Sequence, residues 1–205
     1  MDETSKRIIS DNKLTVIYDI GAYNGSFAKK AKKAFPDNHL YMFEANPSKN
    51  SPLKVTDKIK WFNGVLSDKE DVEVKFYYRD NTGDSYYREN TSNYKDDDYK
   101  LLKTTTLEKI VFDNNLELPQ FIKIDTQGSE LDILSRVDLS ECIAIHCEVP
   151  AENQTYNHDA PNHEQYMAFF MSKGFIYNKV VKDHVKGKVT MQHDVIFSKV
   201  DFKND

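Results

Sequence analysis

Three carboxylates stand where two predicted strands of the chain end. Asp125 and Glu130 flank a predicted strand-to-helix turn, and Glu148 ends the next strand. Carboxylates that converge repel one another unless one is protonated, a cation lies among them, or they bond to a donor such as Lys123. A carboxylate with a raised pKa can remove a proton from a substrate, so we expect these three to be catalytic. Glu130 has a second interpretation, an acid that the helix dipole favours at a helix start.

A glycine turn follows the first predicted strand, in the segment from Asp19 to Gly25 (DIGAYNG). Glycine lets the backbone approach a ligand closely, because it has no Cβ and tolerates positive φ. The spacing of Gly21 and Gly25 differs from the G-x-G-x-x-G dinucleotide fingerprint, which argues against a pyrophosphate site. Glu44, at the end of the second predicted strand, can accept hydrogen bonds from both hydroxyls of a ribose. Together the turn and the acid predict a site for a nucleotide-containing cofactor.

Two long polar segments, 79–100 and 151–162, follow predicted strands without a trusted periodicity. Loops of this length in compact domains are usually functional or disordered. Their tyrosines, asparagines and acids suit stacking on a sugar ring and hydrogen bonding to it, rather than binding a phosphate chain. We expect an acceptor pocket here, and its candidate residues are Tyr86, Tyr87, Tyr156 and His158. A solvated loop histidine remains the alternative for His158.

Metal and redox roles receive less support. Carboxylate oxygens suit Mg²⁺, but two or three acids do not define a site, and no metal is assigned. His146 is interpreted as a packed strand residue. Cys142 and Cys147 lie five positions apart on one predicted strand, where their side chains point to opposite faces. They are therefore interpreted as reduced thiols of the core.

The elements that position these residues alternate between strand and helix. A β-α-β-α-β order predicts a parallel sheet with helices on both faces and an α/β fold. The last two strands are predicted to form an antiparallel hairpin. The predicted strands are 14–20, 39–44, 59–66, 71–78, 120–125, 142–149, 175–182 and 192–199, and the predicted helices are 26–35, 106–112, 129–137 and 163–173.

Composition narrows the class of protein. The 205 residues suit one large domain, and 39% hydrophobic residues with 12 Tyr and 12 Phe are too apolar for a disordered chain. A net charge of −5 without a basic block argues against a nucleic-acid partner. The start of the chain lacks the apolar region of a signal peptide, and no stretch approaches the roughly 20 apolar residues of a membrane span. These features predict a cytoplasmic protein without membrane insertion.

Together the motifs resemble the FkbM-like family of class I S-adenosylmethionine-dependent methyltransferases. The most specific of the matching stretches is FIKIDTQGSELDIL (121–134). The others are DIGAYNG (19–25), FEANP (43–47), GVLSDKEDVEVKFY (64–77), TTLEKI (105–110), CEV (147–149) and DVIFSK (194–199). The resemblance implies a single Rossmann-like methyltransferase domain over residues 1–205, with a core of about 14–199. It implies a seven-stranded, mostly parallel sheet of order 3-2-1-4-5-7-6 with helices on both faces.

The resemblance also implies roles for individual residues. S-adenosyl-L-methionine would be the cofactor, with its ribose on Glu44, its adenine near Leu66 and Asp68, and its methyl group near Asp125. Its methionine part would lie on the loop formed by Asp19, Gly21, Ala22, Tyr23, Asn24 and Gly25. Asn24 stands close to where many such loops carry another glycine, and little chain precedes the first strand for substrate capture.

The implied reaction is O-methylation of a sugar hydroxyl in a glycan or glycosylated metabolite. Two alternatives stay open: N-methylation of an amino sugar or peptide, and a nucleotide-binding module that has lost turnover. The sequence does not identify the small-molecule or glycan acceptor, nor the oligomeric state.

Overall fold

A computed structural model describes residues 1–79, 82–91 and 95–199 of the chain. Its main sheet has seven strands in the order β3-β2-β1-β7-β8-β10-β9. The first five are parallel, and β10 runs antiparallel to both of its neighbours. The predicted order 3-2-1-4-5-7-6 is therefore confirmed. The strands are β1 (Val16–Ile20), β2 (His39–Glu44), β3 (Ile59–Asn63), β7 (Phe121–Ile124), β8 (Ala144–Pro150), β9 (Ile176–Lys186) and β10 (Val189–Ser198).

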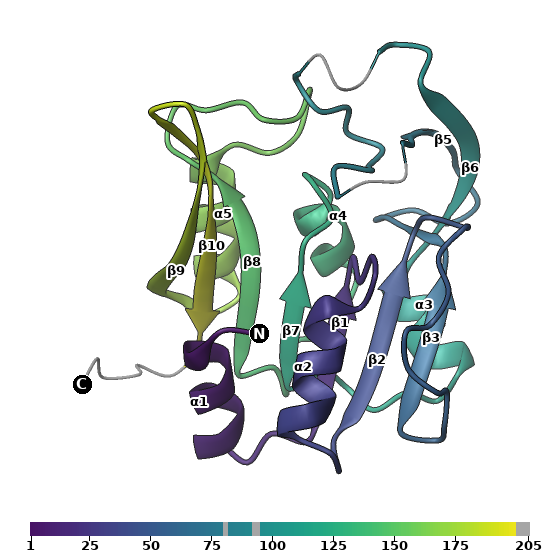
Figure 1. Cartoon of the computed structure of the whole chain (residues 1–205), viewed down its shortest axis with the longest axis vertical. Coiled ribbons are helices and arrows are strands. Elements are labelled where there is room, and N and C mark those ends of the chain that lie inside the picture. Colours follow the sequence, from purple (N-terminus) through teal and green to yellow (C-terminus); the bar gives the residue numbers. More distant parts are fainter. Residues whose placement is uncertain (80–81, 92–94, 200–205) are drawn as a thin grey trace.

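Helices cover both faces of this sheet, as Figure 1 shows. One face carries α1 (Glu3–Asp11) and α2 (Ser26–Ala34), and the other carries α3 (Leu107–Asp113), α4 (Glu130–Ser135) and α5 (His163–Ser172). The helix α2 forms because Ala28 and Ala31 fall on one side of it and lysines on the other, so that one face is buried.

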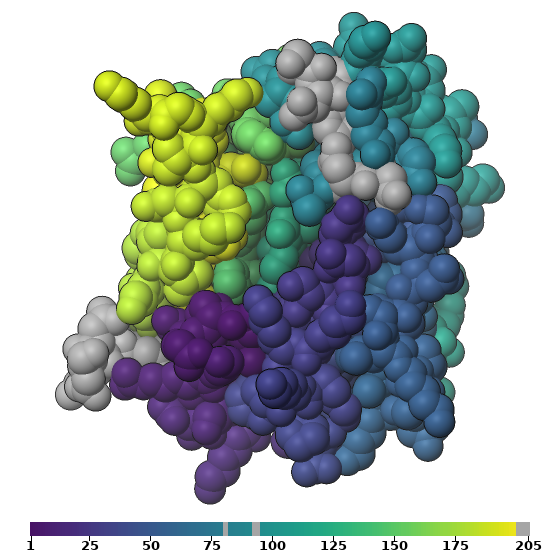
Figure 2. Space-filling view, viewed as in Figure 1, coloured from purple at the N-terminus to yellow at the C-terminus, as the bar shows by residue number. Residues whose placement is uncertain are grey.

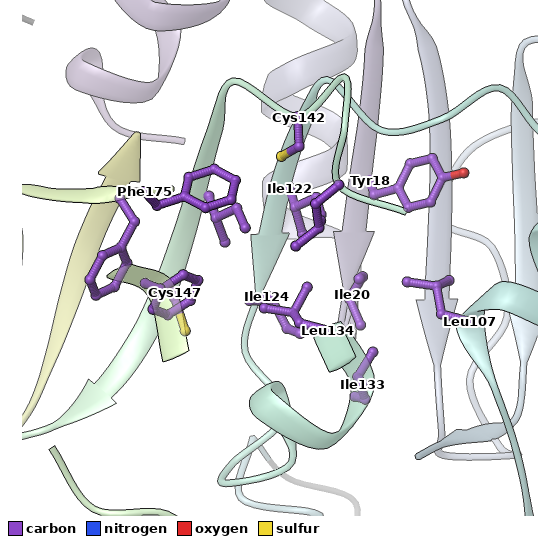
Figure 3. Close-up of a cluster of buried hydrophobic side chains, with 14 of the residues drawn as sticks. Tyr18, Ile20, Leu107, Ile122, Ile124, Ile133, Leu134, Cys142, Cys147 and Phe175 are labelled. Atoms are coloured by element: carbon purple, nitrogen blue, oxygen red, sulfur yellow. The ribbon is translucent and has the colours of Figure 1, made fainter. Parts of the chain in front are cut away.

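The core consists of two layers, because successive residues of a buried strand point to opposite faces. Ile17 of β1 packs with the α1 and α2 layer, whereas Tyr18 and Ile20 pack with the α3, α4 and α5 layer. Figure 3 shows this second layer, with Ile133 and Leu134 of α4 against the strands.

Both cysteines are free and buried, which confirms the interpretation as core thiols. The prediction that they share a strand is wrong, because Cys142 precedes β8 while Cys147 lies within it. Burial raises the pKa of the Cys142 thiol to about 12, so it stays protonated at physiological pH.

Two regions differ from the sequence expectation. The amino-terminal helix α1 was not predicted; Asp2 caps it by accepting a hydrogen bond from the Ser5 N–H at 2.8 Å. The predicted strand 59–66 is interrupted at Gly64, and its second part, β4 (Val65–Leu66), joins a separate three-stranded sheet of order β4-β6-β5. That sheet contains β5 (Glu73–Tyr77) and an unpredicted strand, β6 (Tyr99–Thr105).

Across the described residues, none of the helices is long and apolar enough to span a bilayer.

Candidate active site

The glycine turn and Glu44 meet where β1 and β2 end side by side. The N–H groups of Gly21 and Ala22 donate to the Phe43 carbonyl at 2.9 and 3.0 Å. Glu44 accepts one hydrogen bond on each carboxylate oxygen, from the Tyr23 N–H at 2.6 Å and the Asn46 N–H at 2.7 Å. Burial raises the pKa of Glu44, although these two bonds act against the rise. The carboxylate is thus fixed at the strand end, and each oxygen keeps a lone pair for a further donor.

Gly21 is required for a different reason from the one the sequence suggested. Its φ is +75°, and an added Cβ would lie 1.9 Å from the backbone oxygen of Asp125. The missing side chain therefore lets β1 approach the end of β7 rather than a ligand. Gly25 is similar, because a Cβ there would lie 2.0 Å from Cγ of Pro52. The third left-handed residue of the turn is Tyr23, with φ +47°, and not Asn24.

A first cavity of about 640 Å³, including its mouth, opens above the ends of β1 and β2. Of the predicted cofactor residues, Gly21, Tyr23, Glu44, Leu66 and Asp125 line it. Asp68, also a described residue, is not among the residues that line it; its carboxylate accepts a hydrogen bond from the Ser67 hydroxyl at 3.1 Å. We call this space the cofactor cavity.

Part of the cofactor cavity was missed by sequence reasoning. Phe43 and Val65 stand next to the predicted residues Glu44 and Leu66, so their position beside a strand end was a usable signal. No sequence signal identified the other walls, because they come from a loop, from the second sheet and from α4. These walls include Phe76, Asp84, Ser85, Ser129 and Ile133.

Asp19 lies under the glycine turn, on the α1 and α2 face of the sheet. It is 1% exposed, and its Oδ2 is buried without a hydrogen-bond partner among the described residues. Burial raises its pKa to about 6; Asp125 and Glu44 add to the rise and Lys123 opposes it. A buried carboxylate oxygen without a donor fits a cationic group that arrives with a ligand. Asp19 lines a second cavity together with Ala22 and Asn24.

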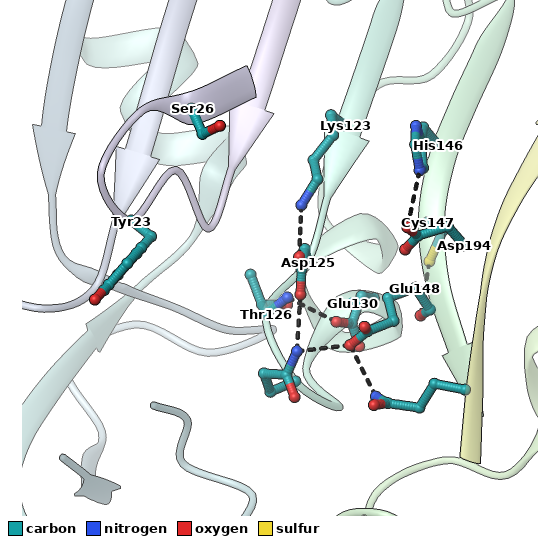
Figure 4. A network of polar contacts seen from close by, with 12 residues as sticks. Tyr23, Ser26, Lys123, Asp125, Thr126, Glu130, His146, Cys147, Glu148 and Asp194 are labelled. Atoms are coloured by element: carbon teal, nitrogen blue, oxygen red, sulfur yellow. Dashed lines mark hydrogen bonds and ion pairs between the residues drawn. The ribbon is translucent and has the colours of Figure 1, made fainter. Parts of the chain in front are cut away.

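Asp125 is held by two donors, Lys123 Nζ and Gln127 Nε2, each at 2.8 Å. Figure 4 shows Lys123 directed at Asp125. Lys123 was predicted from the sequence as such a donor, and its hydrogen bond to Asp125 confirms the prediction. Burial alone would raise the pKa of Asp125, but the charge and hydrogen bond of Lys123 outweigh burial and hold the pKa below its usual value. Asp125 is thus ionised, which corrects the expectation that a base here has a raised pKa.

The pKa is raised at the other two predicted acids, with different surroundings. Glu130 is 1% exposed and accepts hydrogen bonds from the N–H groups of Thr126 and Gly128, at 2.7 and 2.9 Å, and from the Tyr166 hydroxyl. Burial raises its pKa. Because both oxygens hold the turn before α4, the geometry favours the helix-start interpretation of Glu130.

Glu148 is 6% exposed, and its Oε2 accepts from Gln127 Nε2 at 2.6 Å and from Gln192 Nε2 at 2.8 Å. Burial raises its pKa well above the usual value, and the charges of Asp125 and Asp194 add to the rise. Its second oxygen, Oε1, faces His184 of the hairpin strand β9. Glu148 therefore has one oxygen fixed by amides and one directed at a histidine.

The two polar loops lie together, as expected. An isolated bridge joins Glu89 to Asn157, and the His158 N–H donates to the Arg88 carbonyl at 2.8 Å. An open groove lies between the two loops on one side and the hairpin of β9 and β10 with β8 on the other. It is lined by Tyr156, Glu148, Gln192 and His184. We call it the acceptor groove; Figure 2 shows the hollow beside the yellow hairpin.

Three of the four predicted acceptor residues lie outside this groove. The hydroxyls of Tyr86 and Tyr87 both donate to Asp132 Oδ2, at 2.7 and 2.9 Å. Tyr86 lines the cofactor cavity instead. His158 lies 2.7 Å from the Arg88 guanidinium through Nε2, and the described residues that line the groove include neither it nor Tyr87. Tyr156 alone of the four lines the groove.

Asp125 joins these spaces, because it lines the cofactor cavity, the second cavity and the acceptor groove. A model of the methyltransferase FkbM domain matches residues 19–177 of the chain, which include all of these strand ends. The chain belongs to the FkbM methyltransferase family. It is an S-adenosylmethionine-dependent methyltransferase, as the motifs implied. Membership favours an enzyme over the alternative of a nucleotide-binding module without turnover.

Solved structures of low sequence identity resemble this FkbM-family chain. Precorrin-6y C5,15-methyltransferase from Geobacter metallireducens is 15% identical with a TM-score of 0.46, and the match covers 96% of this chain and 86% of that one. The 1,6-didemethyltoxoflavin-N1-methyltransferase of Burkholderia thailandensis, solved with S-adenosylhomocysteine, is 9% identical with a TM-score of 0.47, covering 97% and 78%. Against the pyocyanin biosynthetic protein PhzM, the chain spans 54% of the other protein's length. No curated protein sequence gave a significant match.

Proposed function

We propose that the enzyme methylates a sugar hydroxyl of a glycan or glycosylated metabolite. The observation that carries this proposal is the position of Asp125, which borders both the cofactor cavity and a polar groove. The groove offers hydrogen-bonding groups of both kinds and one aromatic ring, a combination suited to a sugar: Thr82, Glu89, Thr91, Gln127, Tyr156 and Gln192.

The residues at the ends of β1 and β2 have hydrogen-bonding and apolar groups that match the parts of S-adenosylmethionine. Glu44 keeps lone pairs for two ribose hydroxyls, and Leu66 offers an apolar wall for the adenine. Oδ2 of Asp19, which has no hydrogen-bond partner among the described residues, suits the cationic amino group. The rest of the turn, residues 21–25, would line the methionine part. When bound, S-adenosylmethionine supplies a methyl group on a positively charged sulfur.

Asp125 is the proposed proton acceptor. The acceptor oxygen becomes strongly acidic as it forms its bond to the methyl carbon, so an ionised carboxylate of low pKa suffices to take the proton. The carboxylate also orients the hydroxyl before transfer, and Lys123 and Gln127 keep it in place. The acceptor hydroxyl would gain the methyl group that the cofactor supplies and would lose its proton to Asp125, leaving the cofactor as a neutral thioether.

A second candidate is N-methylation of an amino sugar or peptide. It is supported by the acidity of the groove, where the carboxylates of Glu89, Asp125, Glu148 and Asp183 would attract an amine. An amine reaches its nucleophilic form only after losing a proton, and carboxylates favour the protonated form. We therefore prefer the hydroxyl acceptor.

Methyl transfer to defined acceptors tests the choice. The full chain is incubated with S-adenosylmethionine labelled in its methyl group, and with neutral oligosaccharides, amino sugars and peptides in parallel. We expect label in a methyl ether of a neutral sugar, located by mass spectrometry. Label only in amine acceptors would overturn the hydroxyl proposal.

We further propose that residues 1–205 act as one methyltransferase domain with a core of about 14–199. The support is that all seven strands of the main sheet and both helix layers fall within this range or next to it. The cytoplasmic location stays a prediction.

A further inference from the structure

A stripe of ionisable side chains crosses three neighbouring strands beside the acceptor groove. Glu148 of β8 pairs in register with Asp194 of β10, and His184 of β9 pairs with Gln192, two residues before Asp194. His146 stands two residues before Glu148. Since residues two apart share a face of a sheet, these side chains come from three strands onto one face. Figure 4 shows His146, Glu148 and Asp194 in this arrangement.

The distances within the stripe are those of ligands around one ion. His184 Nε2 lies 3.4 Å from Glu148 Oε1 and 3.3 Å from Asp194 Oδ2, and the three ligand atoms lie within 4.8 Å of one another. Metal bonds of about 2.0–2.2 Å to nitrogen and oxygen separate neighbouring ligands of a tetrahedral site by roughly 3.4 Å. One ion can therefore touch all three atoms after small side-chain rotations.

Two ring nitrogens in the stripe are unsatisfied. Among the described residues, Nε2 of His184 and Nε2 of His146 are buried without a hydrogen-bond partner. His146 as a whole is only 7% exposed, and its Nε2 lies 3.9 Å from Asp194 Oδ2. A buried nitrogen without a partner is costly unless another group satisfies it. A metal ion is such a group, because neutral imidazole offers a lone pair at this atom.

The surrounding contacts orient these ligands. Nδ1 of His146 lies 3.2 Å from the Ser5 hydroxyl and 3.3 Å from Asp2 Oδ2, both supplied by the amino-terminal segment. A hydrogen bond at Nδ1 leaves the lone pair on Nε2, the usual arrangement behind a metal-binding histidine. Gln127 and Gln192 hold Oε2 of Glu148 and leave Oε1 for the stripe.

We propose that Glu148, His184 and Asp194 bind a divalent first-row transition metal such as Zn²⁺, Co²⁺ or Mn²⁺, with His146 beside Asp194 and a fourth coordination position left open. The imidazole nitrogens favour such ions over Mg²⁺ and Ca²⁺, which prefer oxygen ligands alone. Two carboxylates balance the charge of one divalent ion. The ion would also relieve the repulsion among the acids that converge here.

The position of the site suggests what else the metal binds. Glu148 and His184 line the acceptor groove, and His146, His184 and Asp194 line the second cavity beside the glycine turn. A metal with an open coordination position would therefore take an oxygen of the acceptor, a hydroxyl or a carboxylate. This role, unlike the site itself, rests on the proposed function. Lys182 borders both spaces and is the competing cation.

Cobalt titration of the metal-free full chain tests the site. We expect one equivalent of Co²⁺ to bind with visible absorption bands that Zn²⁺ displaces. His184→Ala should weaken binding by at least about 100-fold, since even the residues behind metal ligands contribute about 10–100-fold. The matched control is His193→Ala, next to Asp194 on β10 but paired with Asp183 at 2.7 Å, and it should bind as the wild type does. Asp194→Asn provides a second variant if His184→Ala does not fold.

Wild-type protein that binds no stoichiometric Co²⁺ or Zn²⁺ would overturn the site, as would equal loss in His184→Ala and His193→Ala. Calorimetry with S-adenosylhomocysteine on the same samples separates this failure from failure of the proposed function. Cofactor binding and sugar methylation without metal binding would remove only the metal site. Metal binding without any hydroxyl methylation would support the site and remove its role in holding the acceptor.

Discussion

Glu44 is fixed by two backbone N–H groups, so its carboxylate is oriented before any cofactor arrives. Glu44→Ala should weaken S-adenosylhomocysteine binding by about 1.5–3 kcal/mol, the range for hydrogen bonds to a charged group. Isothermal calorimetry measures this change. The control is Glu73→Ala, an exposed acid of β5, which should bind normally. Equal affinity of Glu44→Ala and wild type would remove Glu44 from the cofactor site.

Asp125 is expected to act in catalysis more than in cofactor affinity. Asp125→Asn removes the proton acceptor but keeps the shape of the side chain, so turnover should fall by at least about 100-fold. The affinity for S-adenosylhomocysteine should change little. Initial rates at saturating cofactor, with calorimetry on the same variant, check both. Undiminished turnover would exclude Asp125 as the acceptor of the proton.

Asp19 makes cofactor binding depend on pH. Its pKa is about 6 in the folded protein, against an ordinary value of 3.8, with Lys123, Asp125 and Glu44 as the charged groups facing it. The ionised form binds the cofactor's amino group, so affinity for S-adenosylhomocysteine should rise about tenfold from pH 5 to pH 7. In Asp19→Asn the rise should disappear. A rise of equal size in the variant would assign the pH dependence to another group.

The raised pKa of Asp19 affects folding stability in the opposite direction: a rise in pH that favours cofactor binding lowers the stability of the folded protein. A raised pKa means that the folded protein favours the neutral acid, so the contribution of Asp19 to stability is greatest below about pH 4. It decreases as pH rises to about 6, where the buried carboxyl ionises. Asp19→Asn should therefore unfold at higher urea concentration than wild type at pH 7, and less so at pH 4.

At the scale of elements, the close contact between β1 and β7 depends on Gly21. Gly21→Ala places a Cβ 1.9 Å from the Asp125 carbonyl oxygen at a φ of +75°. Gly187→Ala is the matched control, because Gly187 has φ +66° and no described residue lies within 4 Å of an added Cβ. The control should lose about 1–2 kcal/mol for the left-handed backbone alone. Gly21→Ala should lose a further 1–3 kcal/mol or so from overpacking. Urea unfolding measures both, and equal losses would contradict the close contact.

The buried elements were predictable because their pattern is strong. The nearly unbroken apolar runs that became β1, β2 and β7 set the parallel sheet, and the alanines of α2 mark its buried side. The helix α1 was missed because only Ser5, Ile8 and Ile9 of its nine residues are buried. The strand β6 was missed because it is mostly exposed and pairs in a separate small sheet.

Candidate site residues were predictable where they stand at strand ends. Asp19, Glu44 and Asp125 could be placed in this way, because the carboxyl ends of parallel strands share one edge of the sheet. The association of His184 with Glu148 could not be predicted, since it depends on the register of a hairpin that is long and interrupted by bulges. The loop tyrosines Tyr86 and Tyr87 bond to Asp132, a partner far along the chain that local sequence does not reveal.

At the scale of the whole molecule, the cofactor cavity and the acceptor groove lie on opposite sides of β7 along the carboxyl-end edge of the sheet. The β1, β2 and second-sheet side forms the cofactor cavity, and the hairpin side forms the acceptor groove. The strand β7 lies between them and is followed directly by Asp125, which lines both spaces. This arrangement lets a methyl donor and an acceptor approach one carboxylate from opposite directions.

The most direct test of this arrangement is a crystal structure of the full chain with S-adenosylhomocysteine. We predict that the ribose hydroxyls bind Glu44, that the amino group binds Asp19, and that the sulfur is directed past Asp125 toward the acceptor groove. A ligand lodged away from the ends of β1 and β2, or a sulfur turned from Asp125, would contradict it.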